Sequence, residues 1–190
     1  MPDRNTFHTL KYDDWIALGV DALRRDGPGA LTIDALCKRA RRTKGSFYHH
    51  FKTIGELRRA VARFWIEAEA DLLARIAASG ASPRDRLDEA WRPAAEAAME
   101  LGVRMLAADD PAIRDMVAKA DDRRELVLTT LVASAWPMDG AHAHNLARAL
   151  HALHIAALIR APGDPEGYAR GPGLTLAALV DQSPFKIPPP

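Results

Sequence analysis

The chain has 190 residues, of which 48% are hydrophobic and 27% charged, and its 26 Lys and Arg nearly balance its 25 Asp and Glu. This length and composition suit a folded protein with two domains and argue against long disordered regions. A single cysteine, Cys37, excludes a disulfide framework within the chain, and the lack of a membrane-spanning apolar run or of a signal-peptide core before Leu10 favours a cytoplasmic protein.

The first 55 residues predict three helices. Gly27-Pro28-Gly29 ends the first of them, and Thr32 and Thr43 can each cap the start of a later one. The three helices are expected at Asp13–Asp26, Ile33–Ala40 and Lys44–His50. Because only a tight turn fits between the last two, the segment predicts a helix-turn-helix, with Phe47, Phe51 and Cys37 in its core.

Five further helices are predicted after this segment. They are expected at Thr53–Ser79, Pro83–Ala107, Pro111 to about Trp136, Asp139–Arg160 and Leu174–Asp181. Pro93 should kink the second of them near Trp91, and Pro162 to Pro172 should form a loop. The predicted helix Thr53–Ser79 should pack through apolar residues at three- and four-residue steps, namely Leu57, Val61, Phe64, Ala68, Leu72 and Ile76. The chain is therefore predicted to be all-α, with a three-helix domain at residues 1–54, a helical bundle at 55–182 and a flexible tail at 183–190.

Positive charge is concentrated near the predicted helix-turn-helix. Residues 1–52 contain ten Lys and Arg against six Asp, a net charge of +4, so the remaining 16 basic and 19 acidic residues give −3. Between Lys38 and Lys52 there are six basic residues and no acidic one. Such a patch on a nearly neutral protein indicates a face that binds a polyanion, although an ordinary solvated charge run is the alternative.

The segment from Thr32 to Leu57 reads TIDALCKRARRTKGSFYHHFKTIGEL. It resembles the DNA-binding signature of the TetR family of bacterial transcriptional regulators, most closely from Thr43 to Lys52, within a resemblance that spans roughly Trp15 to Trp65. The resemblance implies a sequence-specific DNA-binding regulator with a helical second domain for ligand binding and dimerisation. It implies no catalytic residue and no cofactor.

The third predicted helix contains the expected DNA contacts. A helix that begins at Lys44 directs free N–H groups at phosphate, and Gly45 lets its backbone approach closely. Lys44 and Tyr48 lie one turn apart, so both can face one groove. The resemblance adds Thr32, Tyr48, His50 and Lys52 as contacts to the DNA backbone. The predicted set is Thr32, Arg42, Thr43, Lys44, Gly45, Ser46, Tyr48, His49, His50 and Lys52. The alternative is a packing role for Tyr48 and plain surface positions for the two histidines.

Three residues depart from the family's usual pattern. Arg41 and Arg42 occupy the turn, where relatives usually have a glycine and a small apolar residue. Arg41 is therefore expected to adopt a left-handed conformation at a cost of roughly 1 kcal/mol, and Arg42 to bury its stem with its charge outward. Ile54 replaces a lysine that touches phosphate in many relatives, so that contact is expected to be absent.

The predicted helix Asp139–Arg160 is apolar on two sides. Leu146, Leu150, Leu153 and Ala157 share one side, and the nearly opposite side carries His144, Ala147, His151, His154, Ile155 and Leu158. The resemblance implies a homodimer formed by this helix and the C-terminal helix, which suits a palindromic operator. The row formed by His144, His151 and His154 also permits a metal site or a pH-responsive interface, but packing is the expected role and no metal is predicted.

The resemblance also implies a small apolar ligand in the second domain. Candidate lining residues are Trp65, Trp91, Met99, Met105, Trp136 and His151, although at helical spacing such residues also form plain core. Two alternatives remain: a DNA-binding regulator controlled by a protein partner or by abundance, and an enzyme on a similar fold. The enzyme hypothesis lacks support, because the sequence contains no Gly-rich phosphate loop, nucleophile elbow or metal-binding motif. Glu67, Glu69 and Asp71 are interpreted as a solvated helix face.

Overall fold

The computed structural model describes residues 10–91 and 96–182, which form helices and no sheet. Its helices are α1 (Tyr12–Asp26), a short 3-10 turn (Pro28–Ala30), α2 (Ile33–Ala40), α3 (Lys44–Tyr48), α4 (Ile54–Ala78), α5 (Pro83–Trp91), α6 (Ala97–Asp109), α7 (Pro111–Ala135), α8 (Gly140–Arg160) and α9 (Pro165–Asp181). The predicted all-α class is confirmed. The tail predicted at 183–190 lies outside the described residues. No helix in the described part is long and apolar enough to cross a membrane.

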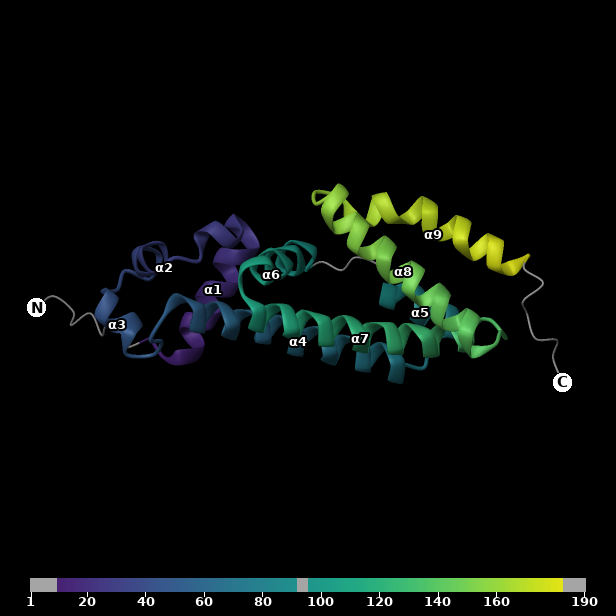
Figure 1. Ribbon diagram of the computed structural model, residues 1–190, viewed down its shortest axis with the longest axis horizontal. Helices are drawn as coiled ribbons and strands as arrows, with labels where there is room; N and C mark the ends of the chain where they lie inside the picture. Colours follow the sequence, from purple (N-terminus) through teal and green to yellow (C-terminus); the bar gives the residue numbers. More distant parts are fainter. Residues whose placement is uncertain (1–9, 92–95, 183–190) are drawn as a thin grey trace, which may run out of the picture.

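The molecule is elongated along α4 and α7, which lie side by side (Figure 1). The small helices α1, α2 and α3 are at one end, next to the N-terminus, and α8 and α9 are at the other. Each of the two long helices spans 25 residues. Together they connect the helix-turn-helix to the C-terminal helices.

Two hydrophobic cores lie along this axis. The first joins α1–α4 to α6 and to the start of α7, through residues such as Trp15, Leu23, Val103 and Ile113. The second joins the end of α4 to α5, α7, α8 and α9. The core of the helix-turn-helix therefore continues past the predicted boundary at residue 54 into α6, and the two cores meet in the middle of the molecule.

Glycines allow close helix contacts within each core. A Cβ on Gly102 of α6 would lie 2.7 Å from Leu23 Cδ1 of α1, and one on Gly173 of α9 would lie 2.3 Å from the Trp91 ring of α5. Neither Leu23 nor Trp91 is free to move away, because both are buried. Glycine at these positions therefore fixes how closely α6 approaches α1 and α9 approaches α5.

The predicted helix Pro83–Ala107 was wrong as a single helix. The chain forms two helices, α5 and α6, and Pro93 lies between them outside the described residues. The predicted loop from Pro162 to Pro172 was also wrong, since α9 begins at Pro165 and contains Pro172. A proline at the first helical position loses no hydrogen bond, and Asp164 caps the helix by accepting from the Gly167 N–H at 2.9 Å.

The buried face of α4 agrees with its prediction at Leu57, Val61 and Ile76 but differs from it between Val61 and Ile76. The structure buries Trp65, Glu69 and Leu73, one residue beyond Phe64, Ala68 and Leu72 in each case. Phe64 is exposed instead. The prediction missed this part of the face because it interpreted Glu69 as a solvated carboxylate, whereas the structure buries Glu69 beside Arg124.

The predicted opposite sides of α8 form one broad buried face. Its buried residues come from both predicted sides and are Ala143, Ala147, Leu150, His151, His154, Ala157 and Leu158. Leu146 and Leu153 are only partly buried, and His144 is exposed. The other side of α8 is exposed and carries small residues, among them Ala149 and Ala152.

Candidate nucleic-acid interface

The helices α2 and α3 each begin at a threonine whose hydroxyl caps the helix. Thr32 Oγ1 accepts a hydrogen bond from the Ala35 N–H at 3.2 Å, and Thr43 Oγ1 accepts one from the Ser46 N–H at 3.4 Å. Caps of this kind satisfy backbone N–H groups that have no partner within the helix. Both predicted caps are therefore confirmed, and these local bonds fix where the two short helices start.

The turn between α2 and α3 contains the one left-handed residue other than glycine in the described part of the chain. Arg41 has φ 51° and ψ 46°, as expected for a position where relatives usually have glycine. The Arg41 N–H donates to the Lys38 carbonyl at 3.2 Å, and the Arg42 N–H donates to the Cys37 carbonyl at 2.9 Å. This is the hydrogen-bond pattern of a Schellman helix end. Arg41 is exposed, so its side chain adds positive charge beside α3.

Aromatic contacts attach α3 to α1. Phe47 is fully buried and meets the Trp15 ring edge-on with centroids 5.4 Å apart, and Phe51 stacks on Tyr12 at 4.7 Å. The predicted core positions of Phe47, Phe51 and Cys37 are confirmed. Because Phe47 points inward, Tyr48 points outward and is 53% exposed. The side of α3 that is predicted to contact DNA is therefore exposed, and its opposite side packs against a buried aromatic cluster.

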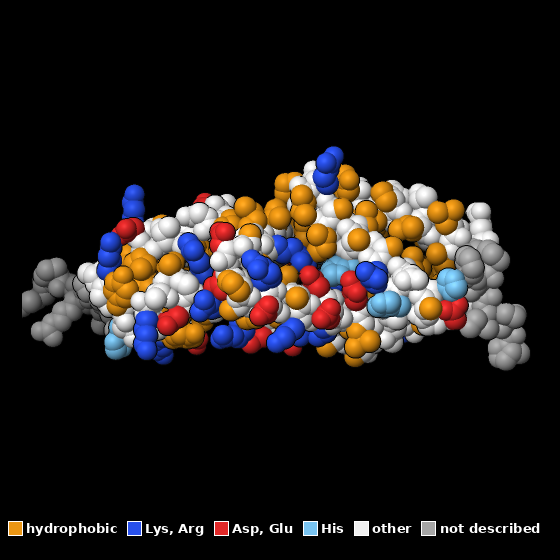
Figure 2. Space-filling model, viewed as in Figure 1, with side chains coloured by type: hydrophobic (Ala, Val, Ile, Leu, Met, Phe, Trp, Pro, Cys, Tyr) orange, Lys and Arg blue, Asp and Glu red, His pale blue; other side chains and the backbone are white. Residues whose placement is uncertain are grey.

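Most of the predicted DNA contacts lie on this surface. Arg42, Ser46 and His50 are partly buried, and the others are exposed, namely Thr32, Thr43, Lys44, Gly45, Tyr48, His49 and Lys52. A Cβ on Gly45 would have only Thr43 Oγ1 nearby, at 3.6 Å, so packing within the chain does not require glycine there. Lys and Arg side chains are prominent at this end of the molecule (Figure 2). The structure thus brings the predicted residues together around the start of α3.

Three of these residues already have contacts within the chain. Lys44 Nζ lies 2.7 Å from Asp34 Oδ1 of α2. His50 Nε2 lies 2.9 Å from the Leu10 carbonyl, which precedes α1. The Lys52 N–H donates to Glu56 Oε2 at 2.7 Å, at the start of α4. The contacts of His50 and Lys52 leave the Lys52 side chain at the surface and connect the segment after α3 to the residue before α1 and to the start of α4.

Ion pairs join the helix-turn-helix region to the second domain. Arg24 of α1 lies 2.7 Å from Glu96, which precedes α6. Arg59 of α4 lies 2.9 Å from Asp110, which caps the start of α7. With the close approach of Gly102 to Leu23, these contacts attach α1 and α4 to α6 and α7. A movement of α6 is therefore expected to move α1, and with it α3.

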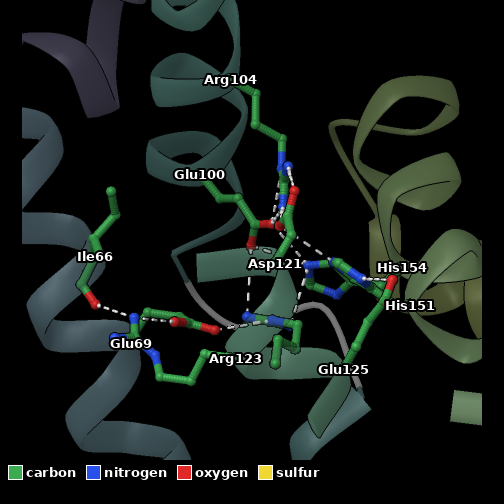
Figure 3. Close-up of polar contacts among 10 residues, drawn as sticks. Ile66, Glu69, Glu100, Arg104, Asp121, Arg123, Glu125, His151 and His154 are labelled. Atoms are coloured by element: carbon green, nitrogen blue, oxygen red, sulfur yellow. Dashed lines mark hydrogen bonds and ion pairs between the residues drawn. The ribbon is translucent and has the colours of Figure 1, made fainter. Parts of the chain in front are cut away.

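A set of charged residues lies where the two cores meet, and sequence reasoning missed most of it. We call it the buried charge network (Figure 3). It comprises Glu69 of α4, Glu100 and Arg104 of α6, Asp121 and Arg124 of α7, and His151 and His154 of α8. Arg123 and Glu125 of α7 lie at its edge. The network thus connects α4, α6, α7 and α8, the helices that lie between the helix-turn-helix and the C-terminal end of the molecule.

Glu100 is the centre of the network. Its carboxylate oxygens lie 3.0 and 2.9 Å from His154 Nε2, and Arg104 Nη2 lies 2.9 Å away. Since a carboxylate only accepts, His154 Nε2 carries the proton in this contact. Burial opposes ionisation, but the hydrogen bond and charge of His154, with those of Arg124 and Arg104, lower the pKa of Glu100 to about 2. Glu100 is therefore ionised at neutral pH despite being buried.

The other carboxylates of the network are also paired. Asp121 accepts from Arg104 at 2.7 Å and lies 3.4 Å from His151 Nε2, and these partners outweigh burial and hold the pKa of Asp121 well below its usual range. Glu69 accepts from Arg124 Nε at 2.9 Å. The interpretation of Glu69 as solvated was wrong. A signal was present, because Glu69 and Arg124 fall on the repeating buried positions of α4 and α7.

The three histidines of the predicted row on α8 contact different side chains. His151 Nδ1 lies 3.2 Å from Glu125 Oε1, His154 is bonded to Glu100, and His144 Nδ1 lies 3.4 Å from the Thr129 hydroxyl. In the described part of the chain, no group of three or more potential ligands has a geometry suited to a metal ion.

A cavity of about 490 Å³ lies at the other end of the molecule, between α5, α8 and α9. Of the six predicted ligand-lining residues, Trp91 and Trp136 line it. Trp65 and Met99 lie in the first core, Met105 is exposed, and His151 belongs to the buried charge network. Leu87, Leu150 and Leu176 complete its apolar wall, and Arg84 lies across the Trp136 ring, 4.8 Å from its centroid.

Comparisons with known proteins agree with this geometry. Residues 16–61 match the model of the bacterial regulatory proteins of the tetR family. No curated protein sequence matches the chain significantly.

Solved structures are similar over nearly the whole chain. A putative transcriptional regulator from Saccharomonospora viridis in complex with choline has a TM-score of 0.72 and 16% identity, over 90% of this chain and 96% of its own. A transcriptional regulator from Rhodococcus sp. Rha1 has a TM-score of 0.72 and 19% identity, over 94% and 100%. SmeT, the repressor of the Stenotrophomonas maltophilia multidrug efflux pump SmeDEF, has a TM-score of 0.53 and 17% identity, over 95% of both chains.

At these identities the structures show a shared fold, while the family model matches the helix-turn-helix itself. The resemblance found in the sequence is thereby confirmed. The N-terminal match therefore identifies residues 16–61 as a DNA-binding domain of the TetR type, on a fold that is shared along nearly the whole chain with solved transcriptional regulators.

Proposed function

We propose that this regulator is a homodimeric repressor that binds a palindromic operator through α3 and leaves it when a small molecule binds between α5, α8 and α9. The observation that carries the proposal is the exposed start of α3, where Lys44 and Tyr48 project from a rigid aromatic base within a strongly basic segment. Such a surface suits a major groove, with Lys44 toward guanine edges and Tyr48 toward a thymine methyl or a phosphate.

The exposed faces of α8 and α9 support dimerisation. Hydrophobic side chains gather at the surface of α9 (Figure 2), where Tyr168, Leu174 and Leu179 are exposed. On α8, Ala149 and Ala152 leave room for a partner helix, and Ile159 is exposed. Two copies joined here would each present one α3, as a two-fold-symmetric operator requires.

The cavity supports control by a small molecule. Its size lies within the range of ligand sites in proteins, and its wall is mainly apolar with two tryptophans. Helices α5, α8 and α9 line the cavity and also belong to the second core, and the buried charge network joins α8 to α6 and α7. A ligand that moved these helices would therefore act on α1 through α6. A solved structure with this fold, the putative transcriptional regulator from Saccharomonospora viridis, is in complex with choline, which favours a small-molecule ligand for this chain. The alternative is a regulator without a ligand, controlled by a protein partner or by abundance. A second domain packed without a cavity would have favoured that alternative.

The DNA-binding proposal is tested by titrating the protein into its own upstream DNA and into a scrambled duplex over a salt series. Lys44→Ala and Tyr48→Ala are compared with Lys119→Ala, which removes an exposed lysine of α7 outside the helix-turn-helix. Specific binding that weakens steeply with salt and is reduced at least about fivefold in each of the first two variants is expected. Failure of the unaltered protein to bind any member of a random-sequence library would overturn the proposal.

Dimerisation and release are tested separately. Ile159→Asp in the exposed face of α8 should give a monomer in sedimentation equilibrium, whereas Met105→Asp, an exposed site on α6, should not. Ala177→Phe, which places a large side chain at the cavity, should abolish release by any ligand found in a screen while leaving DNA binding intact. A ligand that still released this variant would contradict the cavity as its site.

A further inference from the structure

Asp34 is the only acidic residue between Gly27 and Gly55, a segment with six Lys and Arg. It lies in the first turn of α2 and its side chain is 78% exposed. It pairs with Lys44 at 2.7 Å, and the Lys44 side chain is 59% exposed. The single negative charge of the proposed DNA-binding surface is therefore directed at the lysine that is best placed to read a base.

Stability does not explain this pair. Both side chains are mostly in water, where solvent and salt screen the attraction, and pairs this exposed contribute little to folding. The carboxylate would, however, cost affinity on DNA, because it contacts Lys44 and is two residues from Thr32, both proposed to approach phosphate or base edges. An acidic residue in the first turn of α2 favours the helix dipole, but the dipole does not require the contact with Lys44.

The pair has the hydrogen-bonding groups that match one G·C base pair. A lysine without a partner at the start of α3 would be attracted to phosphate oxygens of any sequence. Asp34 competes with those oxygens for the Lys44 ammonium group. Guanine offers two acceptors, O6 and N7, on the floor of the major groove, and the cytosine opposite offers an N4–H donor that a carboxylate accepts. Lys44 and Asp34 can therefore exchange their mutual contact for two contacts to one base pair.

We propose that Asp34 is a specificity-determining residue, which together with Lys44 reads one G·C base pair in each half-site and weakens binding to DNA of other sequences. This inference rests on the proposed binding of α3 to DNA. It assigns opposite effects to the two residues on DNA of random sequence: Lys44 strengthens that binding and Asp34 weakens it.

The test compares the unaltered protein with Asp34→Asn in titrations of operator and scrambled duplex and in selection from a random-sequence library. Asp34→Asn should bind the scrambled duplex more tightly and lose at least about fivefold of the preference for operator, the lower end of what one good base contact contributes. One G·C position in each half-site should lose its preference in the selected sites. Asp115→Asn, which removes the same charge from an exposed site on α7, should change neither quantity.

A second comparison separates a paired role from a general charge effect. In a Lys44→Ala background, Asp34→Asn should no longer change the preference at that G·C position, because the two residues act as a unit. Denaturant unfolding of each variant checks that the fold is retained. An unaltered protein without any sequence preference would overturn the DNA-binding proposal and this inference together. Sequence preference that Asp34→Asn leaves unchanged at every position would overturn the inference alone.

Discussion

Replacing Glu100 with glutamine is expected to lower the free energy of unfolding by about 3 kcal/mol at pH 7. The carboxylate is only 4% exposed and lies within 3.0 Å of both His154 and Arg104. Its partners lower its pKa from 4.5 to about 2. Each unit of that gap corresponds to about 1.4 kcal/mol in favour of the folded protein. A loss of free energy of unfolding of the same size is expected when one partner of a buried ion pair is removed and the other remains.

The pH dependence of this difference follows from the sign of the shift. A carboxylate whose pKa is lowered by folding stabilises the protein fully above its unfolded pKa, and that contribution disappears as the pH falls through the folded pKa. For Glu100 the loss begins near 4.5 and extends toward about 2. The difference between the unaltered protein and Glu100→Gln should therefore shrink to roughly half by about pH 3.

The assay is urea unfolding followed by helical circular dichroism, at equal protein concentrations because a dimer's stability depends on concentration. Glu67→Gln, which changes an exposed carboxylate on α4, is the matched control and should stay within about 0.5 kcal/mol of the unaltered protein. A difference below about 1 kcal/mol at pH 7, or one that stays constant down to pH 3, would refute the assignment of Glu100 as the centre of the network.

Three further changes test the packing and the helix ends. Gly102→Ala would place a Cβ 2.7 Å from buried Leu23, so we expect a loss of about 1–3 kcal/mol, and an unchanged melting temperature would contradict the close contact of α6 with α1. Arg41→Gly relieves a φ of 51° and should stabilise the protein by about 1 kcal/mol in urea unfolding, whereas destabilisation would show that the turn depends on the arginine. Asp139→Ala removes the carboxylate that caps α8 and should lower the free energy of unfolding by about 1 kcal/mol. An unchanged free energy of unfolding would show that this cap does not stabilise the protein.

Local chemistry determined the helix-turn-helix. The threonine caps, the glycine that ends α1 and the arginine forced into a left-handed turn all act within a few residues, and each could be predicted before the fold was known. The buried positions of Phe47 and Phe51 followed from short-range periodicity for the same reason. The proposed DNA surface was predictable because its residues are close together in the sequence.

Long-range contacts determined the second domain. Glu69 is buried beside Arg124, 55 residues away, and although the spacing along α4 places Glu69 on the buried face, that spacing does not identify the arginine that pairs with it. Helix α9 contains Pro172 and packs through Gly173 against the Trp91 ring, a contact that also depends on a distant segment.

The sequence by itself therefore determined the all-α class, the helix-turn-helix and the resemblance to the TetR family, since these depend on hydrogen bonds and side-chain spacing along one stretch of chain. Only the tertiary structure decided where the cavity lies and how Asp34 meets Lys44, and it placed the buried charge network between the two cores. The physical reason is that a buried charge is stable only beside its partner, and packing decides which partners meet.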